Sequence, residues 1–325
     1  EFRRVLFRSW LLTQDSTYDE VNRHERYTKA GGCSWLLDVP ELYSRRAPGN
    51  TCLSALREGT EYEDYVNAHR NNSKGCGGIM RIAPLAVNYE FADITQLDRE
   101  AAQISAITHG HPLGYLPSAI LVHVINHYIF RRQSKASLKE VILDALETIQ
   151  ELYRGEKYLT ELANIVLNAI NLSENDDPDL VNIHRLGEGW VAEETLAISL
   201  YCALRHQDDF SAGVIAAVNH SGDSDSTGAV TGNILGAMLG YEAIEEKWKN
   251  DLELSDVILE MADDLCHGCQ MADFAGSMEM DAGVECSIGF FAEVFHKTDS
   301  DISNYCFAFS SRIVFCFKII VLQTV

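Results

Sequence analysis

Apolar residues recur at intervals of three and four positions over most of the chain, which is the pattern of amphipathic α-helices. The spacing predicts a helix over 117–131, whose apolar face carries Leu121, Val124, Ile125 and Tyr128. A capping box, Ser137 followed by Glu140, predicts the start of the next helix. Further helices are predicted over three more ranges, 159–170, 193–204 and 210–218.

The segments between these helices carry little strand-like alternation, and no repeat of about 20 to 50 residues is visible. The polar stretch SENDDPD is predicted to be a loop because it lacks apolar periodicity and contains a proline. The sequence therefore predicts a single all-α domain, built as an orthogonal multi-helix bundle.

One predicted helix carries glycine at every fourth position, at Gly228, Gly232, Gly236 and Gly240. Each glycine inside a helix costs about 1 kcal/mol relative to alanine, so a compensating contact is needed. A glycine stripe allows another backbone to come close, and we expect this helix to cross the centre of the bundle. A membrane dimer with the same spacing is the poorer interpretation in an acidic chain.

The composition, 46% hydrophobic and 23% charged residues, is that of a globular protein. The net charge of -22 disfavours general nucleic-acid binding, and no basic patch offsets it. Nine scattered cysteines form no disulfide framework, so we expect the reducing cytoplasm. We also expect a monomer, and no membrane partner because no uncharged run in the apolar stretch 304–325 approaches the roughly 20 residues of a membrane span. The pair Cys266 and Cys269 has no second pair at zinc-ribbon spacing.

Both ends of the chain differ from the rest. Residues 1–9 (EFRRVLFRS) can be back-translated into a common sequencing-library adapter and are interpreted as non-native. Residues 273–325 end in an apolar stretch that Arg312 and Lys318 interrupt, and are interpreted as a tail that arose by readthrough or a frame error. The predicted domain is accordingly 10–272.

The segment GDSDSTG precedes the glycine helix and places Asp223, Asp225, Ser226 and Thr227 within five positions. Carboxylates and hydroxyls are the hard oxygen ligands that Mg²⁺ prefers, with water in the remaining positions. The alternative is an ordinary helix start, where Asp and Ser are common caps. Apolar sequence on both sides favours the metal site.

The segment NNSKGCGGIMRIAPL holds Gly75, Gly77 and Gly78, which let a backbone approach a ligand closely. Successive N–H groups in such a loop can bind an anion, with Ser73 as a further donor. The loop lacks the spacing of a nucleotide-binding P-loop and no strand precedes it, so a purely structural loop is the alternative. Arg81 is interpreted as structural.

The segment THGHPLGY contains His109 and His111, which lie two positions apart and cannot form a zinc pair on one helix face. His109 could donate a hydrogen bond to an anionic ligand, and Tyr115 could stack on a base or a ribose. Each could equally be a satisfied core or capping residue.

From Trp10 to Gln270 the chain resembles the ADP-ribosylglycohydrolase family, on SKGCGGIMRIAPL, THGHPLGY, GWVAEETLAISLYC and GDSDSTGAVTGNILGA. The resemblance implies that Asp223, Asp225 and Ser226 are the carboxy-terminal ligands of a site for two Mg²⁺ ions, with Mn²⁺ as an alternative. It implies that the ADP-ribose site uses Ser73, Lys74, Gly75, Cys76, Gly77, His109 and Tyr115. Other members often carry Asn at the position of Cys76.

The resemblance further implies a hydrolase that cleaves the bond between ADP-ribose and an acceptor, either a protein or a small molecule. The G-D-A-x-G and T-D-D-T segments of the family are not present in the sequence. We therefore interpret the chain as truncated at its amino-terminal end, without the acidic residues that complete the metal site and serve catalysis, and expect weak or no activity.

Two alternatives to an ADP-ribosyl hydrolase stay open. A family scaffold without a complete site could bind ADP-ribose, or serve a structural role, without catalysis. The motif DSDST also fits a D-x-D-x-T phosphatase. That motif follows a buried strand, whereas Phe210, Val214 and Val218 have helical spacing.

Overall fold

The computed structural model describes residues 48–58, 64–87, 93–131, 135–250 and 252–267. Within these ranges the chain forms helices and no β-strand, which confirms the all-α prediction. The α-helices are α3 (Asn50–Glu58), α4 (Tyr65–Ala68), α5 (Ile94–Ala106), α6 (Pro112–Phe130), α7 (Leu138–Leu152), α8 (Leu159–Ser173), α9 (Asp179–Leu186), α10 (Ala192–Arg205), α11 (Phe210–Val218), α12 (Ser224–Leu239) and α13 (Ser255–His267).

Short 3-10 helices connect several of these elements: η3 (Ile79–Arg81), η4 (Ala83–Val87), η5 (Tyr241–Ala243) and η6 (Glu246–Trp248). The predictions for residues 1–9 and 273–325 lie outside the described residues, as does Cys269.

Helix α6 is the core of the bundle. It begins at Pro112, directly after its N-cap residue His111. Helices α5, α7, α10 and α12 pack around it. The prediction that this helix has a single apolar face is wrong, because nearly every residue of α6 is buried. The helix is long and apolar enough to cross a membrane by length and composition, but 89% of its most apolar window is buried inside this bundle. Burial on all sides explains its almost uninterrupted apolar sequence.

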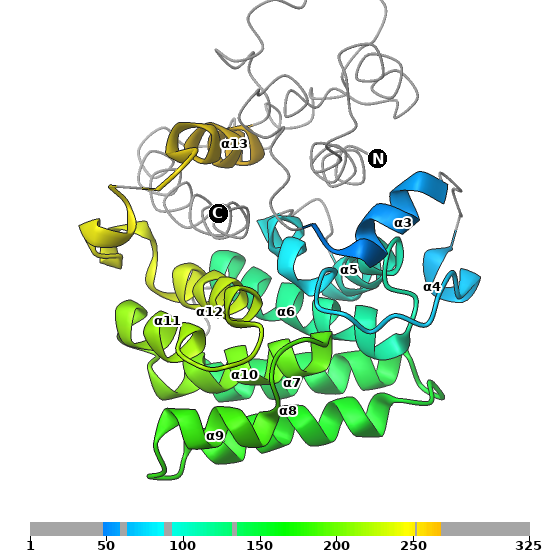
Figure 1. The fold of residues 1–325 in the computed structure, drawn as a ribbon, viewed down its shortest axis with the longest axis horizontal. Coiled ribbons are helices and arrows are strands. Elements are labelled where there is room, and N and C mark those ends of the chain that lie inside the picture. The colour runs from blue at the N-terminus through cyan, green and yellow to red at the C-terminus, as the bar shows by residue number, and fades with distance from the viewer. Residues whose placement is uncertain (1–47, 59–63, 88–92, 132–134, 251, 268–325) are drawn as a thin grey trace, which may run out of the picture.

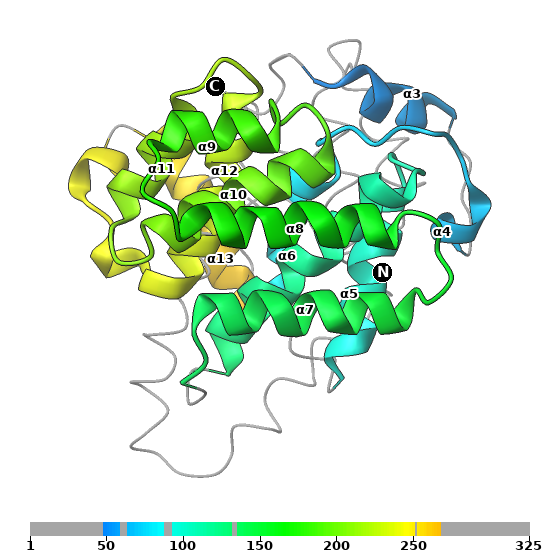
Figure 2. The same ribbon diagram turned by 90° about the horizontal axis from the view of Figure 1, so that it is seen from below.

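Helices α7, α8 and α9 form one side of the molecule, and α12 and α13 lie toward the other (Figure 1). Figure 2 shows α7 and α8 side by side across that face. The predicted capping box is confirmed: the Ser137 hydroxyl accepts from the Glu140 backbone N–H, and the Glu140 carboxylate accepts from that of Ser137. Helix α9, which follows the predicted SENDDPD loop, was not expected. With two turns it is too short to show a clear period.

Helix α12 packs against α6, α10 and α11, as expected for a helix at the centre of a bundle. A Cβ on Gly228 would lie 2.5 Å from Cγ1 of Val218, so the absence of a side chain makes room for this valine where α11 packs on α12. The prediction for Gly240 is wrong. It caps the carboxy-terminal end of α12 with φ of 85°, a positive angle that glycine adopts readily.

Candidate functional site

The glycine loop, residues 71–78, is anchored on the turn between α5 and α6. The side-chain oxygen of Asn71 accepts from the backbone N–H groups of Ser73 and Gly110, both at 3.0 Å. The Ser73 carbonyl accepts from the His111 N–H at 3.2 Å. Within the described residues, the backbone N–H groups of Lys74 and Gly77 have no acceptor in the protein. Such N–H groups are what an anion-binding loop requires.

The other side of the glycine loop pairs with the segment that leads into α10. An isolated antiparallel bridge joins Gly75 to Val191. The Cys76 N–H donates to the Trp190 carbonyl at 3.3 Å, and the Lys74 carbonyl accepts from Ala192 at 2.9 Å. These bonds hold the loop between two helical segments far apart in sequence.

Two residues of this pairing segment were missed by the sequence interpretation. Glu193 is buried at 3% exposure and forms an ion pair with Lys74. Burial raises the pKa of Glu193. Partial burial alone would lower the pKa of Lys74, but the hydrogen bond and charge of Glu193 outweigh it and raise that pKa. Trp190 is 56% exposed beside the loop. The sequence carries no signal for either role, because the exposure of Trp190 and the burial of Glu193 follow from tertiary packing.

His109 lies beneath the glycines. A Cβ on Gly75 would approach its Nε2 to 3.3 Å, and a Cβ on Gly77 would approach its Cε1 to 3.0 Å, so the absence of side chains makes room for the ring. The ring is 3% exposed, and its Nδ1 lies 2.8 Å from the hydroxyl of Thr108. Burial and the nearby Arg81 charge lower the pKa of His109 to about 3. At neutral pH the imidazole is therefore uncharged.

Asp223 stands at the start of α12 and faces the glycine loop. Its Oδ2 accepts from the Cys76 thiol and from the Ser226 hydroxyl, each at 2.8 Å. Burial, together with a hydrogen bond to the Asp225 carboxyl, raises the pKa of Asp223 to about 6. Burial and the Asp223 charge also raise the pKa of the Cys76 thiol, which keeps it protonated as a donor. Asp225 is exposed.

This arrangement fits part of a divalent-cation site. Two carboxylates that face each other are electrostatically unfavourable unless a proton or a cation lies between them. Asp223, Asp225 and Ser226 offer oxygen atoms, the ligand type that Mg²⁺ prefers. In the described ranges no group of three or more His, Cys, Asp or Glu side chains could enclose a metal ion. The three residues would thus supply some ligands, and water or other groups the rest.

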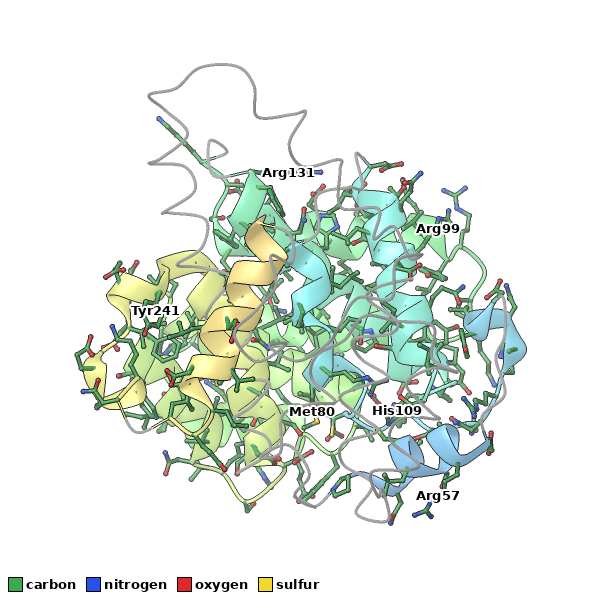
Figure 3. The ribbon with its side chains drawn as sticks, turned by 90° about the horizontal axis from the view of Figure 1, so that it is seen from above. Arg57, Met80, Arg99, His109, Arg131 and Tyr241 are labelled. Atoms are coloured by element: carbon green, nitrogen blue, oxygen red, sulfur yellow. The ribbon has the colours of Figure 1, made fainter. Side chains whose placement is uncertain are left out.

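The structure therefore brings together nearly all of the predicted site residues, from the glycine loop, the α5–α6 turn and the start of α12. Figure 3 shows Met80, which follows the loop, and His109 in the same region of the molecule. The Sδ of Met80 lies 3.2 Å from the hydroxyl oxygen of Ser226, whose proton is given to Asp223.

Tyr115 does not join this group. It is fully buried, with its ring 6.4 Å from that of Tyr153 between centroids. A ring with no exposed face cannot stack on a base or a ribose, so the predicted contact between Tyr115 and ADP-ribose is not supported by its position. The residue is part of the core because α6 is buried on all sides.

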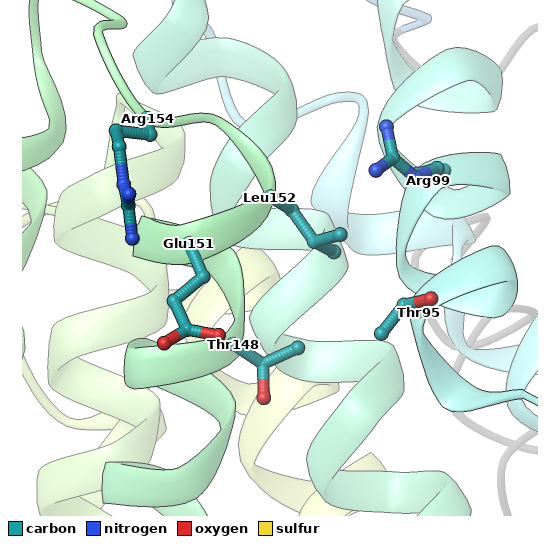
Figure 4. A pocket seen from close by; sticks show the side chains of 6 residues that line it. All are labelled: Thr95, Arg99, Thr148, Glu151, Leu152 and Arg154. Carbon is teal, nitrogen blue, oxygen red and sulfur yellow. The ribbon is translucent and has the colours of Figure 1, made fainter.

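A separate open hollow of about 430 Å³ lies between α5 and α7 (Figure 4). Thr95 and Arg99 line one side, and Thr148, Glu151, Leu152 and Arg154 line the other. None of these residues belongs to the glycine loop or to the start of α12. The hollow is thus distinct from the candidate site.

Comparison with known proteins agrees with these features. The family model for ADP-ribosylglycohydrolase matches residues 3–274. ADP-ribosylhydrolase ARH3 of Mus musculus is 27% identical over 207 residues, covering 56% of this chain and 53% of the relative. The ADP-ribosyl-[dinitrogen reductase] glycohydrolase of Rhodospirillum rubrum is 25% identical over 215 residues, covering 63% and 60%.

A third relative, ADP-ribosylarginine hydrolase Tri1 of Serratia proteamaculans, is 32% identical over 227 residues, covering 70% of this chain and 56% of the relative. The chain thus spans little more than half the length of these curated relatives. The family model matches well over half of the chain, including the glycine loop, the histidine turn and the start of α12. The chain therefore belongs to the ADP-ribosylglycohydrolase family.

Proposed function

We propose that this site binds ADP-ribose together with Mg²⁺, and that it serves the hydrolysis of the glycosidic bond between ADP-ribose and an acceptor. The observation that carries the proposal is the convergence of the glycine loop, His109 and Asp223. An anion-binding loop and a carboxylate pair in direct contact fit a ligand that carries both a diphosphate and ribose hydroxyls. The names of the relatives support the same activity.

Each part of the site has a role in this proposal. The free N–H groups of Lys74 and Gly77 would bind diphosphate oxygens, and His109 would lie under the same loop. Asp223, Asp225 and Ser226 would hold Mg²⁺, with two ions expected and Mn²⁺ as a substitute. A bound Mg²⁺ supplies charge stabilisation and lowers the pKa of coordinated water. The acceptor would be an ADP-ribosylated protein or a small ADP-ribosyl compound, and the setting cytoplasmic.

Calorimetric titration of ADP-ribose into the whole chain, with and without millimolar Mg²⁺, tests the proposal. We expect binding that strengthens when Mg²⁺ is present. Absence of binding in both conditions, from a sample with a helical circular dichroism spectrum, would contradict it. A parallel assay with an ADP-ribosylated peptide separates hydrolysis from binding without turnover, which would favour the non-catalytic alternative.

Trp190 gives a sharper prediction. Its ring is 56% exposed next to the loop, so the replacement Trp190→Ala removes little packing. We expect the adenine of ADP-ribose to stack on this exposed ring. Stacking of a base on an aromatic ring contributes roughly 1 to 3 kcal/mol, so its loss should lower ADP-ribose affinity about tenfold. Affinity for inorganic diphosphate, which has no base, should stay unchanged in the same titration.

The control for this prediction is Trp190→Phe, which keeps an aromatic face and should retain most of the affinity for ADP-ribose. An equal loss for both ligands would show that Trp190 supports the loop and does not contact the base. The unfolding midpoint of both variants should match that of the unaltered chain, because an exposed ring contributes little to the core.

A further inference from the structure

Arg81 is a buried cation directly after the glycine loop, in η3. It is 1% exposed, and within the described residues no carboxylate lies at ion-pair distance from it. Its guanidinium donates to the Gly77 carbonyl, to the Thr108 hydroxyl at 2.5 Å and to the Cys52 sulfur at 3.7 Å. Burying a charge without a counter-ion is costly, so a residue of this kind calls for an explanation beyond packing.

The bond from Arg81 determines how the Thr108 hydroxyl is used. A guanidinium can only donate, so the Thr108 oxygen accepts from Arg81 and keeps one proton to give. Two acceptors are within reach: Nδ1 of His109 at 2.8 Å and the Ser105 carbonyl at 3.5 Å. The shorter and better bond is the one to His109.

The bond from Thr108 then determines the tautomer of His109. A neutral imidazole carries one proton, and an Nδ1 that accepts leaves that proton on Nε2. The low pKa of His109 agrees with a neutral ring. In the opposite tautomer, with the proton on Nδ1, the Thr108 oxygen would accept from both Arg81 and His109. Its own proton could then be donated only to the more distant Ser105 carbonyl. The Nε2 edge faces Gly75 and Gly77 and has no acceptor among the described residues.

We propose that Arg81 is a positioning residue that acts through Thr108 to hold His109 as the Nε2–H tautomer, which donates to an anionic ligand in the glycine loop. The anionic ligand rests on the function proposed above, whereas the relay from Arg81 through Thr108 to His109 is independent of that function. The same guanidinium also holds the Gly77 carbonyl, so one buried group orients both the loop and the ring beneath it.

The test is ¹⁵N NMR of the whole chain with labelled histidine, in which protonated and unprotonated ring nitrogens have well-separated shifts. The His109 signals are assigned by their loss in His109→Gln. We expect a protonated Nε2 and an unprotonated Nδ1 in the unaltered chain. In Thr108→Val, which keeps the shape and removes the hydroxyl, the ring should become a mixture of tautomers. Thr108→Ser should restore the original pattern.

Two further variants complete the design. Ser105→Ala removes a buried hydroxyl at the end of α5 that bonds to Ser118 and lies outside the relay, and it should leave the tautomer unchanged. Arg81→Lys keeps the charge but lacks the planar fork, so it should give the same mixture as Thr108→Val. An unchanged tautomer in a folded Arg81→Lys overturns the role of Arg81. If that variant does not fold, Arg81→Met, which removes the donors and keeps an unbranched side chain, is measured in its place. A protonated Nδ1 in the unaltered chain, or an unchanged tautomer in Thr108→Val, overturns it.

Calorimetry on the same samples tests what the tautomer does. We expect Thr108→Val to lower ADP-ribose affinity in proportion to the rings that leave the Nε2–H tautomer, about twofold for an even mixture, and Thr108→Ser to restore it. An unchanged affinity alongside a mixed tautomer overturns the role of His109 as the donor. If the unaltered chain binds no ADP-ribose, the proposed function fails, while the NMR result still decides the relay.

Discussion

The double substitution Asp223→Ala with Asp225→Ala should abolish the Mg²⁺-dependent part of ADP-ribose binding, a loss of about 100-fold in affinity measured by calorimetry in millimolar Mg²⁺. The two carboxylates are the only acidic side chains on the first turn of α12. Without Mg²⁺ the variant and the unaltered chain should bind ADP-ribose with similar affinity, because the backbone bonds that hold the glycine loop do not involve either aspartate.

Stability separates this effect from a folding defect. Burial raises the pKa of Asp223, so the folded state disfavours the ionised carboxylate. Above pH 6 the ionised Asp223 therefore lowers the stability of the fold, and its removal should not lower the unfolding midpoint. The matched control, Asp176→Ala with Asp208→Ala, removes the same charge from two exposed positions. Mg²⁺-dependent binding that survives in the Asp223 and Asp225 variant would disprove the ligand assignment.

The largest expected effect on stability lies away from the site, in a buried pair between α5 and α6. The Nδ1 of His123 lies 2.9 Å from Oδ2 of Asp98, and both side chains are at most 1% exposed. Burial raises the pKa of Asp98 against the opposing effect of His123. The substitution Asp98→Ala should lower the free energy of unfolding by about 3 kcal/mol, because it leaves a buried ring nitrogen without its partner and opens a cavity.

A matched control exists on the other side of the same histidine. Asp144 lies 3.3 Å from Nε2 of His123 but is 61% exposed, so Asp144→Ala should cost less than about 1 kcal/mol. Asp98→Asn keeps an acceptor for the ring and should fall between the two. Urea unfolding at pH 7 measures all three, and equal losses for Asp98→Ala and Asp144→Ala would show that burial does not decide the strength of this pair.

Much of the secondary structure could be predicted from local pattern. Helices α7, α8, α10 and α11 follow apolar spacing between residues close in sequence, and the confirmed capping box of Ser137 and Glu140 marks the start of α7. The errors have physical causes. Helix α6 is buried on all sides, so its sequence has no polar face that would mark a solvent-exposed side. Helix α9 is too short to show a clear hydrophobic period. Gly240 continued a regular spacing but ends the helix.

The sequence by itself also determined which residue types the candidate site would use: the glycine loop, His109 and the aspartates. Only the tertiary structure decided which of them meet, because contacts such as that of Cys76 with Asp223 join positions 147 residues apart and leave no periodic signal. It placed Tyr115 in the core and Trp190 at the surface. It also placed Arg81 and Thr108 behind His109, since hydrogen-bond partners and burial follow from how the helices pack and not from local spacing.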